Sequence, residues 1–303
     1  SRPAEGEEAE RLRLVVLLCR AASAAAAINL QHGQLVAFNV LPSRDAHRLG
    51  PTVAYTENLA GVGSVAGSMG LRRRRDRIFQ QAYRIAEDLG DPKAYANIVW
   101  FEAFAKVSTC NIADAAHKRG VMDNGIVLRN GHGAKAVGRA LTVQTSKGDW
   151  AKPVEAIDRA KKGDVIVIDV GGAPVAVWGE LATCSAMVMG CTGVVIDGAI
   201  RDIDDIRAMG FPAFARTAVP NAGEPKGYGG IGIEITIGGQ PVRTGDWIMG
   251  DESGLVVVPK EHAVEVANRA LDVHEREDRT REEIMRGSTL SKVNELAKWE
   301  PVR

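Results

Sequence analysis

Apolar residues in the second half of the chain fall into short blocks that follow either a strand period or a helix period. Residues 165–170 and 193–197 are almost continuously apolar, which is typical of strands buried on both faces. Between them, the apolar residues of 181–189 predict a helix that ends at Gly190. A strand, a helix and a second strand in this order indicate a parallel unit whose helix covers the sheet. Further elements of the same kind are expected as strands at 136–145 and 213–216 and as a short helix at 203–209.

The flanking segments predict hairpins and longer helices. Two glycines at 238–239 separate the strand-like runs 231–237 and 241–243, which is a strong hairpin signal. This mixture of parallel units and hairpins predicts an α/β or α+β fold with layered sheets. The remaining expected elements are strands at 247–249 and 255–258 and helices at 78–89, 108–118 and 261–286.

The first eighty residues sustain neither period. A glutamate-rich start (5–10) is followed by an alanine tract (21–27), a Gly/Ser segment (61–70) and four consecutive arginines (72–75). We expect residues 1–80 to form a helical or poorly ordered extension and residues 81–303 to form one domain. The alternative for the extension is an arginine-rich patch that binds an anionic partner.

The composition argues against a nucleic-acid-binding, a membrane-spanning and a disulfide-rich protein. The 303 residues carry 38 basic and 38 acidic side chains, so neither nucleic acid nor an anionic membrane is expected as the main partner. The uncharged stretch 21–43 contains too many polar residues to span a membrane. The four cysteines are scattered without a CxxC pair, which favours reduced, mostly buried thiols over disulfides or a zinc site. We therefore expect a cytoplasmic protein.

The segment 165–202 concentrates groups that can do chemistry. Its path brings the start of a helix, at Glu180, Leu181 and Ala182, to the sheet edge that also carries Arg201 and Asp202. The first backbone N–H groups of a helix have no helical partner, so those of Leu181 and Ala182 favour a carboxylate or a phosphate. A guanidinium suits a carboxylate or an enolate, and a carboxylate offers a hard oxygen ligand to a divalent cation.

Each of these residues also has a purely structural interpretation. Asp202 could cap the helix that follows it, and Arg201 could be a solvated surface charge. Glu180 could simply stabilise the dipole of the helix that it begins. The glycine-rich segment 227–232 leads into a strand and not into a helix, so it does not fit a dinucleotide-binding loop.

The spacing of the acidic residue and the Arg-Asp pair resembles the RraA-like family, because twenty residues separate Glu180 from Arg201. Catalytic members of that family are class II 4-hydroxy-4-methyl-2-oxoglutarate/4-carboxy-4-hydroxy-2-oxoadipate aldolases. The likeness extends over roughly 108–290, and it includes Gly-Glu-Leu-Ala at 179–182, Gly-Cys-Thr-Gly-Val-Val-Ile-Asp-Gly at 190–198, Phe-Pro-Ala-Phe-Ala-Arg at 211–216, Gly-Asp at 245–246 and Asp-Glu-Ser-Gly-Leu-Val-Val-Val-Pro at 251–259.

The resemblance implies a fold and a reaction. The fold would be a layered β/β/α swivelling domain, assembled as a homotrimer or a hexamer with sites between subunits. The reaction would be metal-dependent cleavage of a 4-hydroxy-2-oxo acid to pyruvate and a second oxo acid, with oxaloacetate decarboxylation as a side activity.

The resemblance also implies a role for each residue of the Arg-Asp motif. Asp202 would hold Mg²⁺ or Mn²⁺, and Arg201 would bind the pyruvyl group and stabilise its enolate. Gly179, Leu181 and Ala182 would bind substrate, with the two amides of Leu181 and Ala182 on the pyruvate carboxylate.

Two further acidic positions follow from the resemblance. Glu180 stands where family members usually have Asp, and it would polarise the water that carries the proton. A glutamate from the C-terminal helix of a neighbouring subunit would also approach the metal waters. Glu277 is the candidate for that glutamate, with Glu275 and Glu283 as rivals.

The far end of the substrate is the least defined part. Arg216, Arg139 and Lys147 are conceivable contacts for its distal carboxylates.

The alternative function comes from a different class of protein. The family is named after a protein that binds and inhibits a ribonuclease without catalysing a reaction. Such regulators lack the acid after the motif arginine, so the presence of Asp202 favours catalysis.

Overall fold

The computed structural model describes residues 77, 80–82, 84, 101–129, 131 and 133–295. Of the predicted extension, Arg77 and Gln80 are described and helical, as are the described members of the predicted helix 78–89. The rest of the extension and the end of that helix lie outside the described residues, so the boundary at residue 80 stays a prediction. Among the described residues, no helix is both long enough and apolar enough to cross a membrane.

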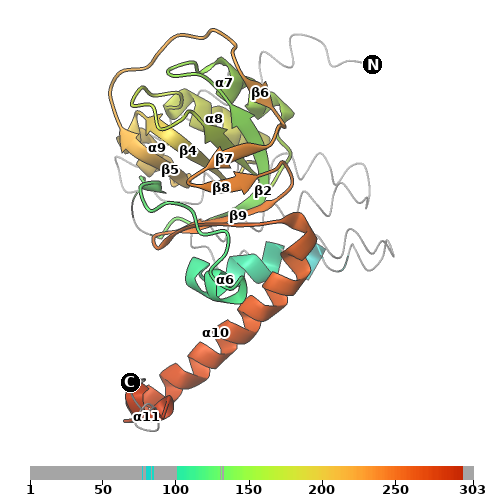
Figure 1. The fold of residues 1–303 in the computed structure, drawn as a ribbon, viewed down its shortest axis with the longest axis vertical. Coiled ribbons are helices and arrows are strands. Elements are labelled where there is room, and N and C mark those ends of the chain that lie inside the picture. The colour runs from blue at the N-terminus through green and yellow to red at the C-terminus, as the bar shows by residue number, and fades with distance from the viewer. Residues whose placement is uncertain are drawn as a thin grey trace, which may run out of the picture.

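A mixed sheet of eight strands forms the centre of the fold, in the order β1-β5-β4-β3-β2-β9-β10, with β6 paired to β2 (Figure 1). Strands β2 to β5 are parallel neighbours, so their carboxyl ends share one edge of the sheet. The other pairs are antiparallel. The strands are Val127–Leu128 (β1), Ala136–Gln144 (β2), Asp164–Asp169 (β3), Gly193–Ile200 (β4), Ala213–Ala218 (β5), Gly230–Ile231 (β6), Trp247–Asp251 (β9) and Gly254–Val258 (β10).

Three helices cover one face of the parallel strands: α7 (Ala151–Arg159), α8 (Glu180–Met189) and α9 (Ile203–Met209). They share an apolar cluster with alternate strand residues such as Ile166 and Ile168 of β3. Strand β4 is buried along its whole length, as its nearly continuous apolar pattern predicts for a strand that is covered on both faces.

The opposite face of the sheet curls into a nearly closed barrel. Val167 and Val195 pack in its interior together with residues of β9, β10 and the hairpin β7–β8. Strands β7 (Ile235–Ile237) and β8 (Gln240–Val242) form a separate two-stranded sheet over this face. Hairpin, central sheet and helices are the three layers of a β/β/α arrangement, so the predicted fold class is confirmed.

A third apolar cluster lies outside the barrel, where α6 (Thr109–Ala115) and the start of α10 (Ala263–Met285) pack on β9 and β10. Trp247 of β9 is central to it. Its ring centroid lies 4.7 Å from that of Phe101 and 5.3 Å from that of Phe104. These aromatic contacts fasten the described residues 101–107 to the outside of the sheet.

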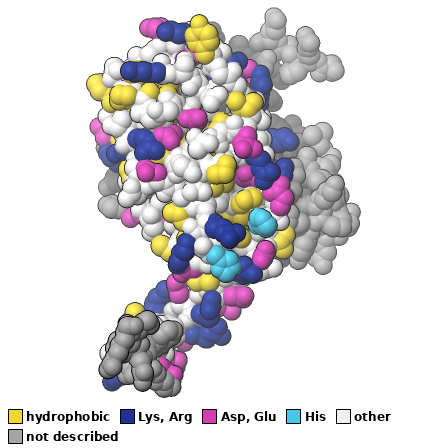
Figure 2. Space-filling view, viewed as in Figure 1, with side chains coloured by type: hydrophobic (Ala, Val, Ile, Leu, Met, Phe, Trp, Pro, Cys, Tyr) yellow, Lys and Arg dark blue, Asp and Glu magenta, His cyan; other side chains and the backbone are white. Residues whose placement is uncertain are grey.

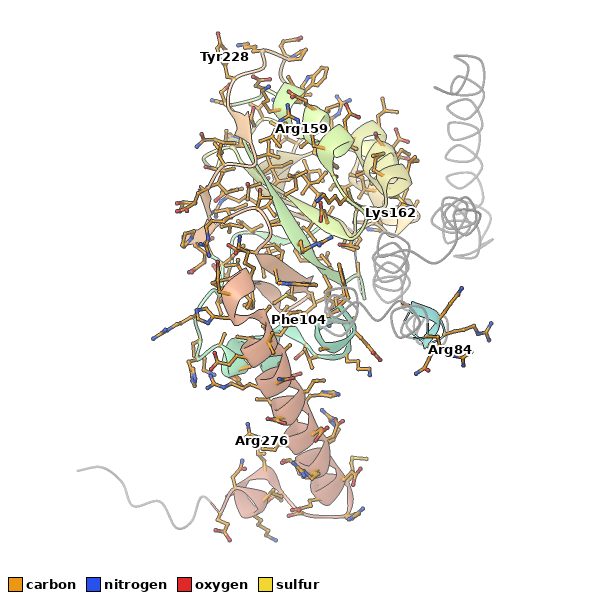
Figure 3. All side chains as sticks on the ribbon, turned by 90° about the vertical axis from the view of Figure 1, so that its right-hand side faces the viewer. Arg84, Phe104, Arg159, Lys162, Tyr228 and Arg276 are labelled. Carbon is orange, nitrogen blue, oxygen red and sulfur yellow. The ribbon has the colours of Figure 1, made fainter. Side chains whose placement is uncertain are left out.

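Helix α10 continues away from the body of the molecule and is followed by the short helix α11 (Leu290–Val293) (Figure 1). Figure 3 shows Phe104 beside the body and Arg276 well along the projecting part of α10. Figure 2 shows acidic and basic side chains mixed along this projection.

Several predicted elements have other bounds in the structure. Strands β4 and β5 continue beyond their predicted ends at residues 197 and 216, to Ile200 and Ala218. The helix predicted over 108–118 begins with a capping box between Ser108 and Asn111, but α6 ends at Ala115 because His117 and Lys118 adopt left-handed φ values of 54° and 65°. The strand predicted over 231–237 is divided by Gly232, whose φ of 84° is also left-handed. Its first part is β6, which pairs with β2, and its second part is β7 in the hairpin.

Candidate active site

Arg201 and Asp202 follow the carboxyl end of β4 directly, at the edge shared by the parallel strands. Asp202 adopts a left-handed φ of 56° and is the residue before α9, yet its side chain makes no capping bond to that helix. Its Oδ2 instead accepts the backbone N–H of Glu180 at 3.1 Å and lies 3.2 Å from Nε of Arg201. The carboxylate therefore joins the two motif halves, and helix capping does not account for it. We call Arg201, Asp202 and residues 179–182 the Arg201–Asp202 corner.

Gly179 permits the close approach of the two halves. A Cβ at this position would lie 2.5 Å from Oδ2 of Asp202 and 3.1 Å from Cγ of Arg201. The φ of Gly179 is −161°, an extended conformation that any residue adopts. Glycine is therefore needed here for space and not for backbone conformation.

The first turn of α8 presents two backbone donors without a partner. The N–H of Glu180 bonds Asp202 and that of Thr183 bonds the carbonyl of Gly179. Among the described residues, no hydrogen bond engages the N–H of Leu181 or Ala182, and Gly179 has no side chain with which to cap the helix. Uncapped amides at the positive end of a helix dipole attract an anion.

Two buried side chains hold this turn in place. The indole Nε1–H of Trp178 donates to Oγ1 of Thr183 at 2.9 Å, and that hydroxyl donates to the carbonyl of Gly179 at 2.9 Å. The carbonyl of Trp178 accepts the backbone N–H of Arg201 at 3.1 Å. These hydrogen bonds link the start of α8 to Arg201. The link is buried, because Trp178 is 3% exposed and Thr183 is fully buried.

Glu180 is directed along its own helix. Its Oε1 accepts the thiol of Cys184, one turn later, with an Oε1–Sγ distance of 3.3 Å. Stabilisation of the helix dipole therefore does not fully describe Glu180, because the thiol of Cys184 also orients one of its carboxylate oxygens. The sequence predicts Cys184, like the other cysteines, as a reduced and mostly buried thiol, and its burial agrees with this, but the contact with Glu180 was not predicted. The spacing of four residues on one helix was the available signal.

Asp202 could hold a divalent cation. Its Oδ2 makes both contacts described above, and among the described residues no hydrogen bond engages Oδ1. The described residues contain no group of three or more His, Cys, Asp or Glu side chains arranged to hold a metal ion. One hard carboxylate oxygen, with water and substrate completing the shell, fits Mg²⁺, which dehydrates reluctantly.

Three loop segments follow the carboxyl ends of β2, β3 and β5, at the sheet edge that also carries the corner. We call these residues, 145–150, 175–178 and 219–229, the rim. The N–H of Val219 bonds the carbonyl of Ile200, which immediately precedes Arg201. The N–H of Ala176 bonds the carbonyl of Asn221. The rim is thereby tied to both segments that carry the corner.

Asp149 anchors the glycine-rich part of the rim. Its fully buried carboxylate accepts the backbone N–H groups of Lys226, Tyr228 and Ala151 at 2.9, 2.8 and 3.0 Å. Burial alone would raise the pKa of Asp149, but these bonds outweigh burial and hold the pKa below its ordinary value. Tyr228 is 64% exposed and lies at the end of the molecule opposite Arg276 (Figure 3).

The three basic residues considered for the far end of the substrate lie in different places. Arg216 is engaged by the carboxylates of Asp197 and Asp123, which raise the pKa of its guanidinium. Arg139 stands near the amino end of β2, 3.7 Å from Asp164, at the sheet edge opposite the corner. Lys147 belongs to the rim and is exposed. Of the three, Lys147 alone combines the correct edge with exposure.

Glu277 does not join the corner within one chain. It lies on the projecting helix α10, where its Oε2 accepts the side-chain N–H of Asn111 of α6 at 2.8 Å. Helices α8 and α9 lie in the body, away from that projection (Figure 1). A role for Glu277 therefore requires a neighbouring subunit, and it stays a prediction together with the rivals Glu275 and Glu283.

Comparisons with known proteins identify the family to which the chain belongs. The family described as "RraA-like: Aldolase/RraA" matches residues 109–257, which include the whole corner. An uncharacterized protein of Methanocaldococcus jannaschii is 41% identical over 161 residues, covering 52% of this chain and 77% of the relative. A protein of Halalkalibacterium halodurans, named "Putative 4-hydroxy-4-methyl-2-oxoglutarate aldolase", is 37% identical over 176 residues, covering 58% of this chain and 83% of the relative.

A solved structure extends the likeness to three dimensions. The crystal structure of an uncharacterized protein from Pseudomonas syringae pathovar tomato is 32% identical and superimposes with a TM-score of 0.58. The match covers 64% of this chain and 92% of that one. With its motif, its layers and its relatives in agreement, this chain belongs to the RraA-like family.

Proposed function

We propose that this protein is a pyruvate-forming lyase that cleaves carbon–carbon bonds in 4-hydroxy-2-oxo acids of the 4-hydroxy-4-methyl-2-oxoglutarate type. Decarboxylation of oxaloacetate is the expected side activity, since it leaves the same enolate. One observation carries the proposal. Two backbone donors that lack a partner among the described residues, at Leu181 and Ala182, adjoin a paired guanidinium and carboxylate at Arg201 and Asp202. The Halalkalibacterium relative, named for this aldolase, supports the same class of reaction.

The corner can anchor a 2-oxo acid by its carboxylate. The amides of Leu181 and Ala182 would receive that carboxylate at the positive end of α8. Arg201 is 42% exposed, so it can reach a bound substrate. Its contact with Asp202 uses Nε, and a guanidinium carries four further N–H donors. These donors would face the oxygen on which negative charge develops.

The bond cleavage needs a charge acceptor and a proton carrier. Removing the proton from the 4-hydroxyl lets the bond between C3 and C4 break, and its electron pair passes into the enolate of pyruvate. Arg201 would stabilise that enolate because a fixed cation needs no reorganisation during the reaction. Glu180, acting through a water, would accept the hydroxyl proton and return it to C3, which yields pyruvate.

Asp202 is the residue that would hold a divalent cation, Mg²⁺ or Mn²⁺, through the Oδ1 atom that the corner leaves unused among the described residues. When bound, such a cation would act as a Lewis acid toward the 2-oxo group. Asp202 thus has two tasks in the proposal, because its Oδ2 also orients Arg201 and the first turn of α8.

Steady-state pyruvate release tests the proposal. Purified protein would be assayed with 4-hydroxy-4-methyl-2-oxoglutarate and with oxaloacetate, in the presence of Mg²⁺ or of EDTA. We expect turnover that EDTA abolishes, and a loss of about 10²- to 10³-fold in kcat for both Arg201→Ala and Asp202→Asn. Asn is also tolerated in the left-handed conformation of residue 202, so the fold should survive that substitution.

A matched control is Ser185→Ala, which changes an exposed position of α8 away from the corner and should leave kcat unchanged. Activity that withstands EDTA and both corner substitutions would exclude the proposal. Absence of turnover together with tight binding to a ribonuclease would instead establish the non-catalytic regulator as the function. The presence of Asp202 supports catalysis over that alternative.

A further inference from the structure

We propose that the buried thiol of Cys184 is a positioning residue, which fixes the carboxylate of Glu180 for proton transfer at the Arg201–Asp202 corner. The inference rests on the proposed function and assigns a task to a side chain that the corner itself does not include. It follows from the hydrogen bond between Sγ of Cys184 and Oε1 of Glu180, 3.3 Å long.

The two side chains meet because of helix geometry. Residues four apart lie on one face of a helix, and Cys184 follows Glu180 by one turn of α8. Cys184 is 9% exposed and packs in the cluster between the helices and the sheet. Sδ of Met209, 3.8 Å from Sγ, is a second acceptor for its single thiol proton, but it lies farther away than Oε1 of Glu180 at 3.3 Å and accepts more weakly than a carboxylate. Because the sulfur is packed in the core, its position is defined, and it can orient the carboxylate of Glu180.

The side chain of Glu180 would otherwise be free to adopt several rotamers. A glutamate side chain has three rotatable bonds, and Glu180 is only partly buried at the start of α8. Its backbone is fixed by the N–H bond to Asp202, but that bond leaves the side chain free to choose a rotamer. The thiol selects the rotamer in which Oε1 points along α8 toward residue 184.

The contact gives the two oxygens of the Glu180 carboxylate different surroundings. Oε1 is engaged by the thiol, whereas no hydrogen bond engages Oε2 among the described residues. The second oxygen therefore remains available to a water that would carry the proton. A thiol is a weak donor, so the contact orients the carboxylate through a single weak hydrogen bond.

A double-mutant cycle tests the proposal through pyruvate release. In the wild-type background, Cys184→Ala should lower kcat about two- to fivefold with KM unchanged, the size expected for one weak hydrogen bond. Cys184→Ser keeps a donor at the same position and should restore most of that loss. In a Glu180→Asp background the shorter side chain no longer reaches residue 184, so Cys184→Ala should cause no further change in kcat.

Cys191→Ala is the matched control. Cys191 is also buried, two residues beyond the last residue of α8, and among the described residues its thiol makes no hydrogen bond to the corner. The control should leave kcat unchanged. A merely structural role of Cys184 predicts a different result, namely the same loss of activity from Cys184→Ala in the wild-type and the Glu180→Asp backgrounds.

A second readout does not depend on activity. The infrared S–H stretching band of Cys184, isolated as the difference between wild type and Cys184→Ser, should lie at lower frequency than that of a thiol without an acceptor. In Glu180→Ala, which removes the acceptor from the helix surface, the band should return to higher frequency.

The outcomes separate the two proposals. Wild type without turnover ends the proposed function, and the positioning role ends with it. An active wild type whose kcat does not change in Cys184→Ala, or falls equally in both backgrounds, overturns the positioning role alone. An S–H band whose frequency does not change in Glu180→Ala also overturns the positioning role. This readout holds even if Cys184→Ala folds poorly.

Discussion

Gly179 brings the start of α8 against the carboxylate of Asp202, and this contact can be tested with one methyl group. In Gly179→Ala the new Cβ would lie 2.5 Å from Oδ2 of Asp202, so the carboxylate or the helix must move. A displacement of about 1 Å at a reacting centre can cost about 100-fold in rate. We expect kcat/KM for pyruvate release to fall by about that factor.

The fold should tolerate the same substitution, because the φ of −161° at residue 179 suits alanine. Circular dichroism and thermal unfolding would establish that the variant is folded. The exposed variant Ser185→Ala on the same helix serves as the comparison. A Gly179→Ala protein with full activity would show that the corner does not need the observed approach of Asp202 to α8.

At the scale of elements, Asp149 links the loop after β2 to the glycine-rich part of the rim, and this link predicts a pH dependence. The folded pKa of Asp149 lies below its ordinary value, so its contribution to stability is fully present above the unfolded pKa of about 3.9 and is lost as pH falls through the folded pKa. Asp149→Asn should remove about 2–3 kcal/mol at neutral pH, because the amide replaces a carboxylate that accepts several N–H groups.

Urea unfolding at a series of pH values measures this effect. The difference between wild type and Asp149→Asn should shrink below about pH 4 and vanish once the wild-type carboxylate is protonated. Asp158→Asn, on the exposed side of α7, should match wild type at neutral pH. A stability difference that stays constant down to about pH 2 would mean that packing, and not the charge, is responsible.

Elements with a strong local period could be predicted from the sequence. The short helix α9 has the predicted bounds Ile203–Met209, and β2 and β3 agree with prediction to within one residue at each end. Helix α7 was not predicted, because it carries Pro153 near its start and has no side-chain cap at Trp150. Its buried residues Pro153, Ala156 and Ile157 show the face that a longer search for helix spacing would have found.

Part of the candidate site could also be predicted from the sequence, and part could not. The motif spacing indicated Arg201, Asp202 and the start of α8, because a sheet edge follows from strand order. The rim and the bond between Cys184 and Glu180 depend on tertiary contacts and side-chain rotamers. The spacing of four residues places Cys184 and Glu180 on one face of α8, but it does not determine their rotamers, so the bond itself could not be predicted. The rim contacts leave no periodic pattern in the sequence.

At the scale of the whole molecule, the projecting part of α10 bears on how the site is completed. Among the described elements, α10 contacts α6, α11 and the short 3₁₀ helix Lys260–His262, and its distal half extends away from the body (Figure 1). Met285 and Leu290, at and beyond the end of that half, are 81% and 55% exposed. We propose that the chain assembles as a homotrimer or a hexamer, in which Glu277 of one subunit approaches the Arg201–Asp202 corner of the next.

Subunit complementation tests this assembly directly. If each site combines Asp202 of one chain with Glu277 of another, then Asp202→Asn and Glu277→Gln chains should each be weakly active alone. Co-expressed with two affinity tags and purified through both, they should regain activity at up to about a quarter of the sites when subunits mix at random in a cyclic oligomer. The amide oxygen introduced by Glu277→Gln can still accept the N–H of Asn111, so the substitution preserves the contact between α6 and α10.

The control pair for this experiment is Asp202→Asn with Arg201→Ala. These two substitutions damage the same corner, so mixing the two chains produces a site without either substitution only if neighbouring chains share that corner. No recovery in the test pair would place Glu277 outside the site, because only a residue supplied by the neighbouring chain can be restored by mixing. Recovery in the control pair would contradict the assignment of Arg201 and Asp202 to the site of one chain, and recovery in the test pair would then no longer identify Glu277.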